Sequence, residues 1–212
     1  MIKAKRFTYN FCTLTTGRCF LFFCLMITAV TIIAGCNSPF VQKKPGYFKI
    51  DFPEKKYAVF NQPGYPYTFE YPVYAGIVKD STFFDEAAEN PWWINIDFKQ
   101  FDAKIYISYK QIGKQSFAKL LNDAFKLTGK HDVKANSIDD SAFTTQNNIN
   151  GVYFKVGGDV ASANQFFLTD TSKHFLRGSL YFNAPPNADS LEGVNSFIAA
   201  DLRHLINTFK WK

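Results

Sequence analysis

Cysteine is missing from most of this chain. All four cysteines lie at or before position 36: Cys12, Cys19, Cys24 and Cys36. The rest of the chain therefore forms no disulfide, and it offers neither a thiol nucleophile nor a thiolate ligand for a metal ion. Packing must stabilise the fold instead, and an aromatic content of 18% is well suited to supply it.

Acidic residues are absent from the first 35 positions, which hold four basic residues: Lys3, Lys5, Arg6 and Arg18. The apolar stretch Leu21–Cys36 follows them and ends in small residues. A basic start, an apolar run and small residues before a cleavage point are typical of a secretory signal peptide. The alternative is an uncleaved membrane anchor, but the run is shorter than the roughly 20 apolar residues that such a helix needs. We therefore predict a signal peptide over residues 1–35.

The end of this predicted signal peptide, Ile33-Ala34-Gly35-Cys36, resembles a bacterial lipobox. The thiol of Cys36 is then expected to receive a diacylglyceryl group, and cleavage leaves Cys36 as the first residue, often with palmitate or another acyl chain on its amine. One acyl chain binds a membrane reversibly, at about 0.8 kcal/mol per buried CH2, so two or three chains anchor a protein stably. We expect a lipidated tether over residues 36–56 and one envelope domain over residues 57–212, outside the cytoplasm.

The charge balance gives no support for a nucleic-acid partner. Four of the 24 basic residues and none of the 18 acidic residues lie in the first 35 positions, which leaves a net charge of only +2 in the rest of the chain. The remaining basic residues are spread out and form no basic block. We therefore expect no nucleic-acid binding.

Hydrophobic periodicity predicts a single α+β domain. Apolar residues alternate with polar ones where strands are expected, and they recur every three or four residues where helices are expected. The predicted strands are Tyr67–Tyr71, a hairpin over Trp92–Lys110, 152–156, 163–169 and 175–183. The predicted helices are Gln115–Lys130, with Ser116 as its N-cap, and a terminal helix capped by Asp189. We expect a mainly antiparallel sheet covered by two main helices, a layout similar to the PsbP/Mog1-type fold.

Three stretches outside these elements carry weaker patterns. The segments 75–91 and 132–150 are polar with little periodicity, so we predict surface loops, with a short helix as the alternative in the first. The tether contains several aromatic residues, and we expect Tyr47–Phe52 to lie along the domain surface.

Residues suited to catalysis do not form a recognisable pattern. No pair among His131, His174 and His204 has the short spacing of a metal site, and a structural or surface role is the simpler interpretation of each. Asp170, Ser172 and His174 lie within five residues, but the members of a catalytic triad come from separate elements. We interpret them as a hydrogen-bonded turn. The sequence therefore predicts no catalytic residue, no metal and no cofactor.

Two groups of residues are candidates for binding a partner. The neighbours Trp92 and Trp93 are expected on opposite faces of a strand, so that one is buried and the other is exposed for contact with protein, sugar or membrane. The alternative is that the preceding loop covers both.

The second group lies on the face of the last predicted strand that should point away from the core. Phe175, Arg177 and Tyr181 share this face, and Lys173 and His174 stand at its entrance. Aromatic residues and Arg are typical of interface anchors. The alternative is that a helix covers this face and that Arg177 pairs internally with an acid.

A family resemblance is strongest over the run Phe167–Gly178, which is far more specific than a short motif. Other stretches after Cys36 extend it: Pro45–Pro53, Phe69–Pro72, Tyr181–Asn183, Pro186–Ser190 and Thr208–Lys212. With them the chain resembles the gliding motility lipoprotein GldD family of the Bacteroidetes. The resemblance implies an envelope lipoprotein required for gliding, a machinery tied to the type IX secretion system. It provides only one functional residue, the lipidated Cys36.

Two functions remain open at this point. The first is a non-enzymatic lipoprotein that binds other envelope proteins of the gliding and secretion machinery. The second is a periplasmic enzyme or a lipoprotein that binds a small ligand such as a cell-wall glycan. A flat aromatic patch would favour the first, and a deep pocket with convergent polar groups the second. The residues after Cys36 lack the acidic cluster of some surface-exported lipoproteins, so we expect the protein to face the periplasm.

Overall fold

The computed structural model describes residues 21, 25–26, 46, 49–79, 82–83 and 86–212. The chain divides into two units, Met1–Gly46 and Tyr47–Lys212, and every strand and helix named below belongs to the second. Cys36 and all but three residues of the predicted signal peptide lie outside the described residues. Within the described part, no helix is long and apolar enough to cross a membrane.

A seven-stranded antiparallel sheet forms the centre of the domain, in the order β3-β6-β7-β11-β10-β9-β8. The strands with alternating buried and half-buried side chains, or with a fully buried run, lie in the middle of the sheet. The bounds in sheet order are β3 Gly76–Lys79, β6 Ile94–Phe98, β7 Ala103–Gln111, β11 His174–Phe182, β10 Asn164–Thr169, β9 Asn150–Gly158 and β8 Ala135–Thr144.

Two smaller sheets complete the strands. One has the order β1-β2-β12 and the other pairs β4 with β5. In the three-stranded sheet, the short strand β12 brings the end of the chain back onto β2, where Trp211 pairs with Tyr67. The bounds are β1 Tyr57–Phe60, β2 Tyr67–Pro72, β4 Thr82–Phe83, β5 Glu86–Ala87 and β12 Lys210–Trp211, with a 3-10 turn η1 at Lys99–Phe101.

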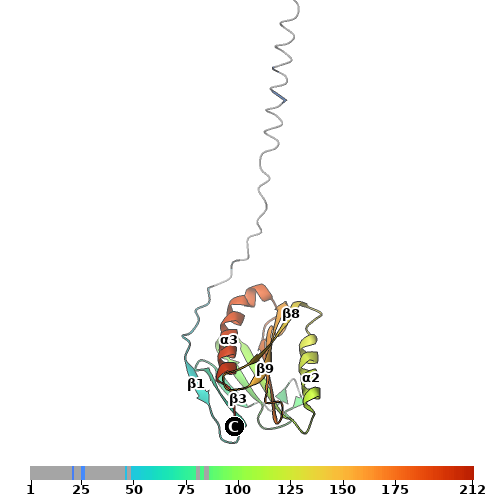
Figure 1. The fold of residues 1–212 in the computed structure, drawn as a ribbon. Helices are drawn as coiled ribbons and strands as arrows, with labels where there is room; N and C mark the ends of the chain where they lie inside the picture. The colour runs from blue at the N-terminus through green and yellow to red at the C-terminus, as the bar shows by residue number, and fades with distance from the viewer. Residues whose placement is uncertain (1–20, 22–24, 27–45, 47–48, 80–81, 84–85) are drawn as a thin grey trace, which may run out of the picture. The chain divides into compact units, whose positions relative to one another are not determined.

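Two helices, α2 (Phe117–Gly129) and α3 (Ala188–Thr208), lie on opposite sides of the large sheet (Figure 1). As predicted, Ser116 caps α2, and its hydroxyl accepts a hydrogen bond from the Lys119 N–H. The predicted cap of the terminal helix is wrong. The Asn187 side chain accepts from the Ser190 N–H at 2.9 Å, so α3 begins before Asp189, which lies in its first turn.

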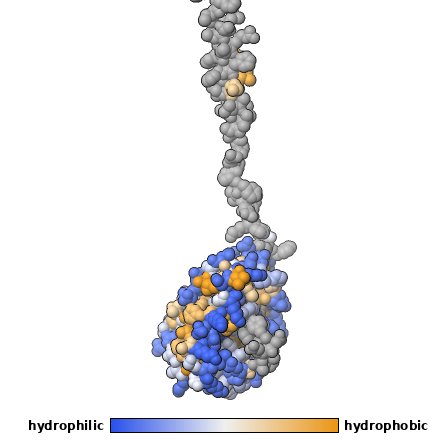
Figure 2. Space-filling model, turned by 90° about the vertical axis from the view of Figure 1, so that its right-hand side faces the viewer, coloured by the Kyte–Doolittle hydropathy of each residue, from blue (hydrophilic) through white to orange (hydrophobic). Residues whose placement is uncertain are grey.

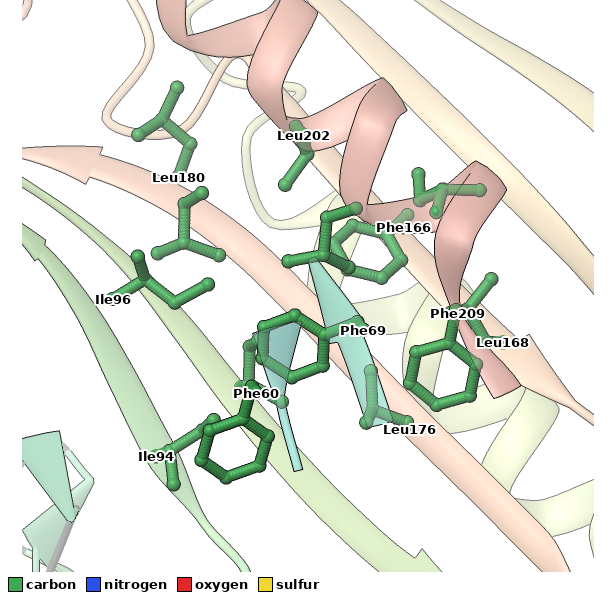
Figure 3. Packing of buried hydrophobic residues seen from close by; sticks show 14 of the residues in the cluster. Phe60, Phe69, Ile94, Ile96, Phe166, Leu168, Leu176, Leu180, Leu202 and Phe209 are labelled. Carbon is green, nitrogen blue, oxygen red and sulfur yellow. The ribbon is translucent and has the colours of Figure 1, made fainter. Parts of the chain in front are cut away.

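The main hydrophobic core lies between α3, the small β1-β2-β12 sheet and one face of the large sheet. Figure 3 shows Leu202 of α3 and Phe69 of β2 in this cluster together with Leu176 and Leu180 of β11. A second cluster lies under α2 on the other face, where Leu120 and Ala124 pack on Phe154, Phe167 and Phe175. These two layers confirm the predicted α+β fold.

The two predicted loops are wrong, because each contains an edge strand of the large sheet. Segment 132–150 contains β8, and segment 75–91 contains β3 and the short pair β4-β5. Most side chains of β8 and β3 are exposed, so a buried face leaves no alternating pattern in the sequence. Hydrogen bonds to β9 and β6 fix these strands instead.

Candidate functional site

Four aromatic rings from distant segments meet at one end of the large sheet, where β7 ends and β11 begins. They belong to Trp92, Tyr109, His174 and Trp211, and we call this group the aromatic end. The Tyr109 hydroxyl lies 2.6 Å from His174 Nδ1, and the His174 ring stacks on Trp211 with 4.9 Å between centroids. Trp92 packs edge-on against Tyr109 at 5.4 Å. Tyr109 is buried, and the other three are half-buried, so the group forms part of the surface.

The turn between β10 and β11 holds His174 in this position. One carboxylate oxygen of Asp170 accepts hydrogen bonds from the backbone N–H groups of Ser172, Lys173 and His174, at 2.8 to 3.0 Å. Burial tends to raise the pKa of Asp170, but these three donors and the nearby His174 outweigh it, so the pKa lies below its usual value. Asp170, Ser172 and His174 thus form the predicted hydrogen-bonded turn. Lys173, in the same turn, is exposed.

The aromatic end is uncharged at neutral pH. Burial lowers the pKa of His174, which Asp170 raises in part and Lys173 lowers further. Burial also raises the pKa of Tyr109 to about 12, helped by the charge of Asp170. These shifts favour the neutral forms of both groups, so the contact between the Tyr109 hydroxyl and His174 Nδ1 is a hydrogen bond between uncharged partners.

The two tryptophans have different environments. Trp93 is only 6% exposed, and its indole N–H donates to the carbonyl of Tyr109 at 2.8 Å. Trp92 is half-buried, and its indole N–H donates to the backbone carbonyl of Gly64 at 2.7 Å. The backbone therefore fixes both indoles, and only Trp92 contributes ring surface to the aromatic end.

The residues of the last predicted strand do not form one surface. Helix α2 covers Phe175, which is 4% exposed and stacks on Phe167 at 5.2 Å, so a partner docking on the folded domain does not reach it. Arg177 is half-buried and donates to Gln165 Oε1, a neutral partner where the sequence suggested an acid. Tyr181 packs edge-on against Tyr106 and lines a separate open cavity.

The three histidines lie in three different places. His174 belongs to the aromatic end, and His131 follows the C-terminal end of α2. His204 of α3 lies with Nε2 2.7 Å from a carboxylate oxygen of Glu70 and stacks on Tyr57. In the parts of the chain that are described, no three His, Cys, Asp or Glu side chains are grouped to hold a metal ion.

Sequence patterns did not identify Tyr109 and Trp211 as members of the site. Tyr109 alternates with polar residues as an ordinary buried strand residue does, and Trp211 follows the terminal helix by only a few positions. Their contacts with His174 depend on β7 pairing with β11 and on β12 pairing with β2. Only the sheet topology shows that these segments meet.

Comparisons with known proteins complement this geometry. The family model described as gliding motility lipoprotein GldD matches residues 37–211. No curated protein sequence matches the chain. Among solved structures, the solution structure of cyanobacterial PsbP (CyanoP) from Synechocystis sp. PCC 6803 is similar at 11% identity. The match has a TM-score of 0.43 and covers 78% of this chain and 98% of that one.

Proposed function

Because the chain belongs to the gliding motility lipoprotein GldD family, we propose that it supports gliding by binding other envelope proteins and not by catalysis. Family membership makes it a membrane-anchored lipoprotein of the cell envelope. The proposed partners are components of the gliding machinery and of the type IX secretion system tied to it.

The proposed anchor is the lipid on Cys36. Signal peptidase would remove residues 1–35, and two or three acyl chains, palmitate among them, would then hold the mature chain at the membrane. The proposed orientation places the domain in the periplasm, since the residues after Cys36 include Lys43 and Lys44 but no acidic cluster.

The observation that carries the proposed protein contact is the aromatic end. Aromatic rings held in place by neighbouring groups are typical of interface anchors, because little side-chain freedom is lost on binding. The hollow beside Trp92 has a volume of only about 40 Å³. Ligand pockets usually have about 300 Å³ or more. A shallow aromatic surface of this kind suits a protein partner better than a small ligand.

Site-specific crosslinking in living cells tests this proposal. A photoreactive amino acid at position 173 stands at the edge of the aromatic end, while position 139 on β8 is also exposed and serves as the control. We expect a defined crosslinked envelope protein from position 173 and none from 139. Identical products from both positions, or no product from 173 in gliding cells, would contradict the proposed contact.

A further inference from the structure

A second surface feature lies on the opposite side of the domain from α3. A cavity of about 330 Å³ opens between α2 and strands β7 and β11. Its floor is apolar, with buried Leu120, Ala124 and Phe175, and Leu127 adds a side chain that is 38% exposed. Figure 2 views the domain from the α2 side and shows hydrophobic patches among hydrophilic residues. An apolar group of a ligand would displace water from this floor.

The rim of the same cavity is positively charged. Lys110, Lys126, Lys130 and Arg177 line it together with one acid, Asp123. Lys110 forms an ion pair with Glu89 at 2.7 Å. For the other three cations, no carboxylate of the described residues lies within ion-pair distance. The negative end of the α2 dipole accounts for Lys126 in its last turn and Lys130 at its C-cap, but it does not account for an arginine on β11.

Arg177 is the unusual member of this rim. Its guanidinium donates to the amide oxygen of Gln165, a side chain with 0% exposure, and burial lowers the pKa of Arg177. The pKa of His131 is lowered by burial and by the charge of Arg177, so this charge acts within the domain. A charge that is partly removed from water is normally paired with an opposite charge. Here the neighbouring partner is neutral, and the guanidinium has five N–H donors.

From this arrangement we infer that the cavity binds the C-terminus of a partner protein that ends in an apolar residue such as Leu or Phe. A terminal residue carries its carboxylate and its side chain on one Cα, so a cavity of about 330 Å³ accommodates both at once. The carboxylate would contact Arg177 and Lys126, and Arg binds carboxylates in a two-point geometry. The apolar side chain would pack on Leu127, the most exposed apolar residue of the lining. That the occupant is a protein rests on the proposed function. The binding of a carboxylate beside an apolar group does not depend on it.

Saturation-transfer difference NMR tests this binding with small mimics of a chain end. The full-length lipoprotein in lipid nanodiscs is mixed with N-acetyl-leucine or N-acetyl-phenylalanine, and empty nanodiscs provide the background. We expect signals from both acids, and none above background from N-acetyl-leucinamide, which lacks the charge, or from N-acetyl-glycine, which lacks the side chain. Equal signals from the acid and the amide would overturn the inference.

Variants assign the binding to the cavity. Arg177→Gln should abolish binding, and Lys126→Gln with Lys130→Gln should raise the Kd about three- to fivefold, as for partly exposed charges. Lys119→Gln removes an exposed lysine of the same helix that does not line the cavity, and it should change nothing. Should Arg177→Gln fail to fold, the double lysine variant decides.

Unchanged binding in the lysine variant would overturn the inference. Binding of hexyl phosphate without binding of N-acetyl-leucine would also overturn it, and would indicate a lipid phosphate as occupant. Because the readout is binding by the purified protein and not gliding, such a failure would leave the proposed function at the aromatic end untouched.

Discussion

Asp201 connects the beginning of the domain to its last helix. Its side chain is 1% exposed, and one carboxylate oxygen lies 2.6 Å from Lys55 Nζ and 3.0 Å from the Tyr57 hydroxyl. The other oxygen accepts from the Tyr74 hydroxyl at 2.6 Å. Lys55 also donates to the carbonyl of Phe197 and lies over its ring. A buried carboxylate with these donors fixes the end of the predicted tether and the start of β1 onto α3.

Replacing Asp201 by Ala should destabilise the domain strongly. Breaking a buried pair typically costs about 3–5 kcal/mol, and we expect about 3 kcal/mol because Lys55 keeps part of its exposure to water. Urea unfolding of the purified protein measures the change. Asp132→Ala removes an exposed acid after α2, and its effect should stay below about 0.5 kcal/mol. Equal effects of the two changes would show that the Asp201 contacts add little.

Asp170 should make the stability depend on pH in the acid range. Its pKa in the folded protein lies below the usual value, so its contribution is present above the unfolded pKa of about 3.9 and is lost as the pH falls through the folded value. Asp170→Asn should therefore be less stable than the wild type at pH 7, and the difference should shrink below about pH 4. A difference in unfolding free energy that stays constant from pH 7 to pH 2.5 would contradict this account.

At the scale of elements, sequence patterns identified the helices and strands that have a buried face. The β6–β7 hairpin, β10, β11 and both helices follow the predicted periodicity. The edge strands β8 and β3 were missed because their side chains are mostly exposed, so backbone pairing and not burial defines them. Periodicity also placed Phe175 and Arg177 on one face of β11, but it could not decide whether α2 covers that face.

Helix α3 should be needed to close the main core, and a matched pair of substitutions tests this. Leu202 of α3 is 0% exposed, whereas Leu127 of α2 is 38% exposed. Leu202→Ala should cost about 2–5 kcal/mol through lost burial and the cavity that remains. Leu127→Ala makes the same chemical change at a partly exposed site and should cost less than about 1 kcal/mol. Thermal unfolding of both variants measures the difference, and similar melting temperatures would count against a closing role for α3.

At the scale of the whole molecule, we propose a lipid anchor joined to a folded domain that contacts a partner. The anchor rests on residues before the domain, so its loss should leave the domain itself intact. Cys36→Ala should accumulate as an uncleaved precursor and abolish gliding, because lipidation precedes cleavage at a lipobox. Mass spectrometry of the N-terminus should find an acylated Cys36 in the wild type. An unmodified N-terminus at another position in gliding cells would rule out this anchor.

The most direct test of the central claim is the gliding of cells that carry Lys173→Glu as their only copy. Lys173 is exposed beside the neutral aromatic end, and its backbone N–H and carbonyl make the hydrogen bonds that hold it, so a change of side chain should not change the fold. Reversing this charge should disrupt a complementary partner surface. We predict loss of gliding with normal lipidation, protein level and melting temperature, while Lys119→Glu on α2 glides normally. Normal gliding by the Lys173→Glu cells would contradict the proposal that this end of the domain binds the partner.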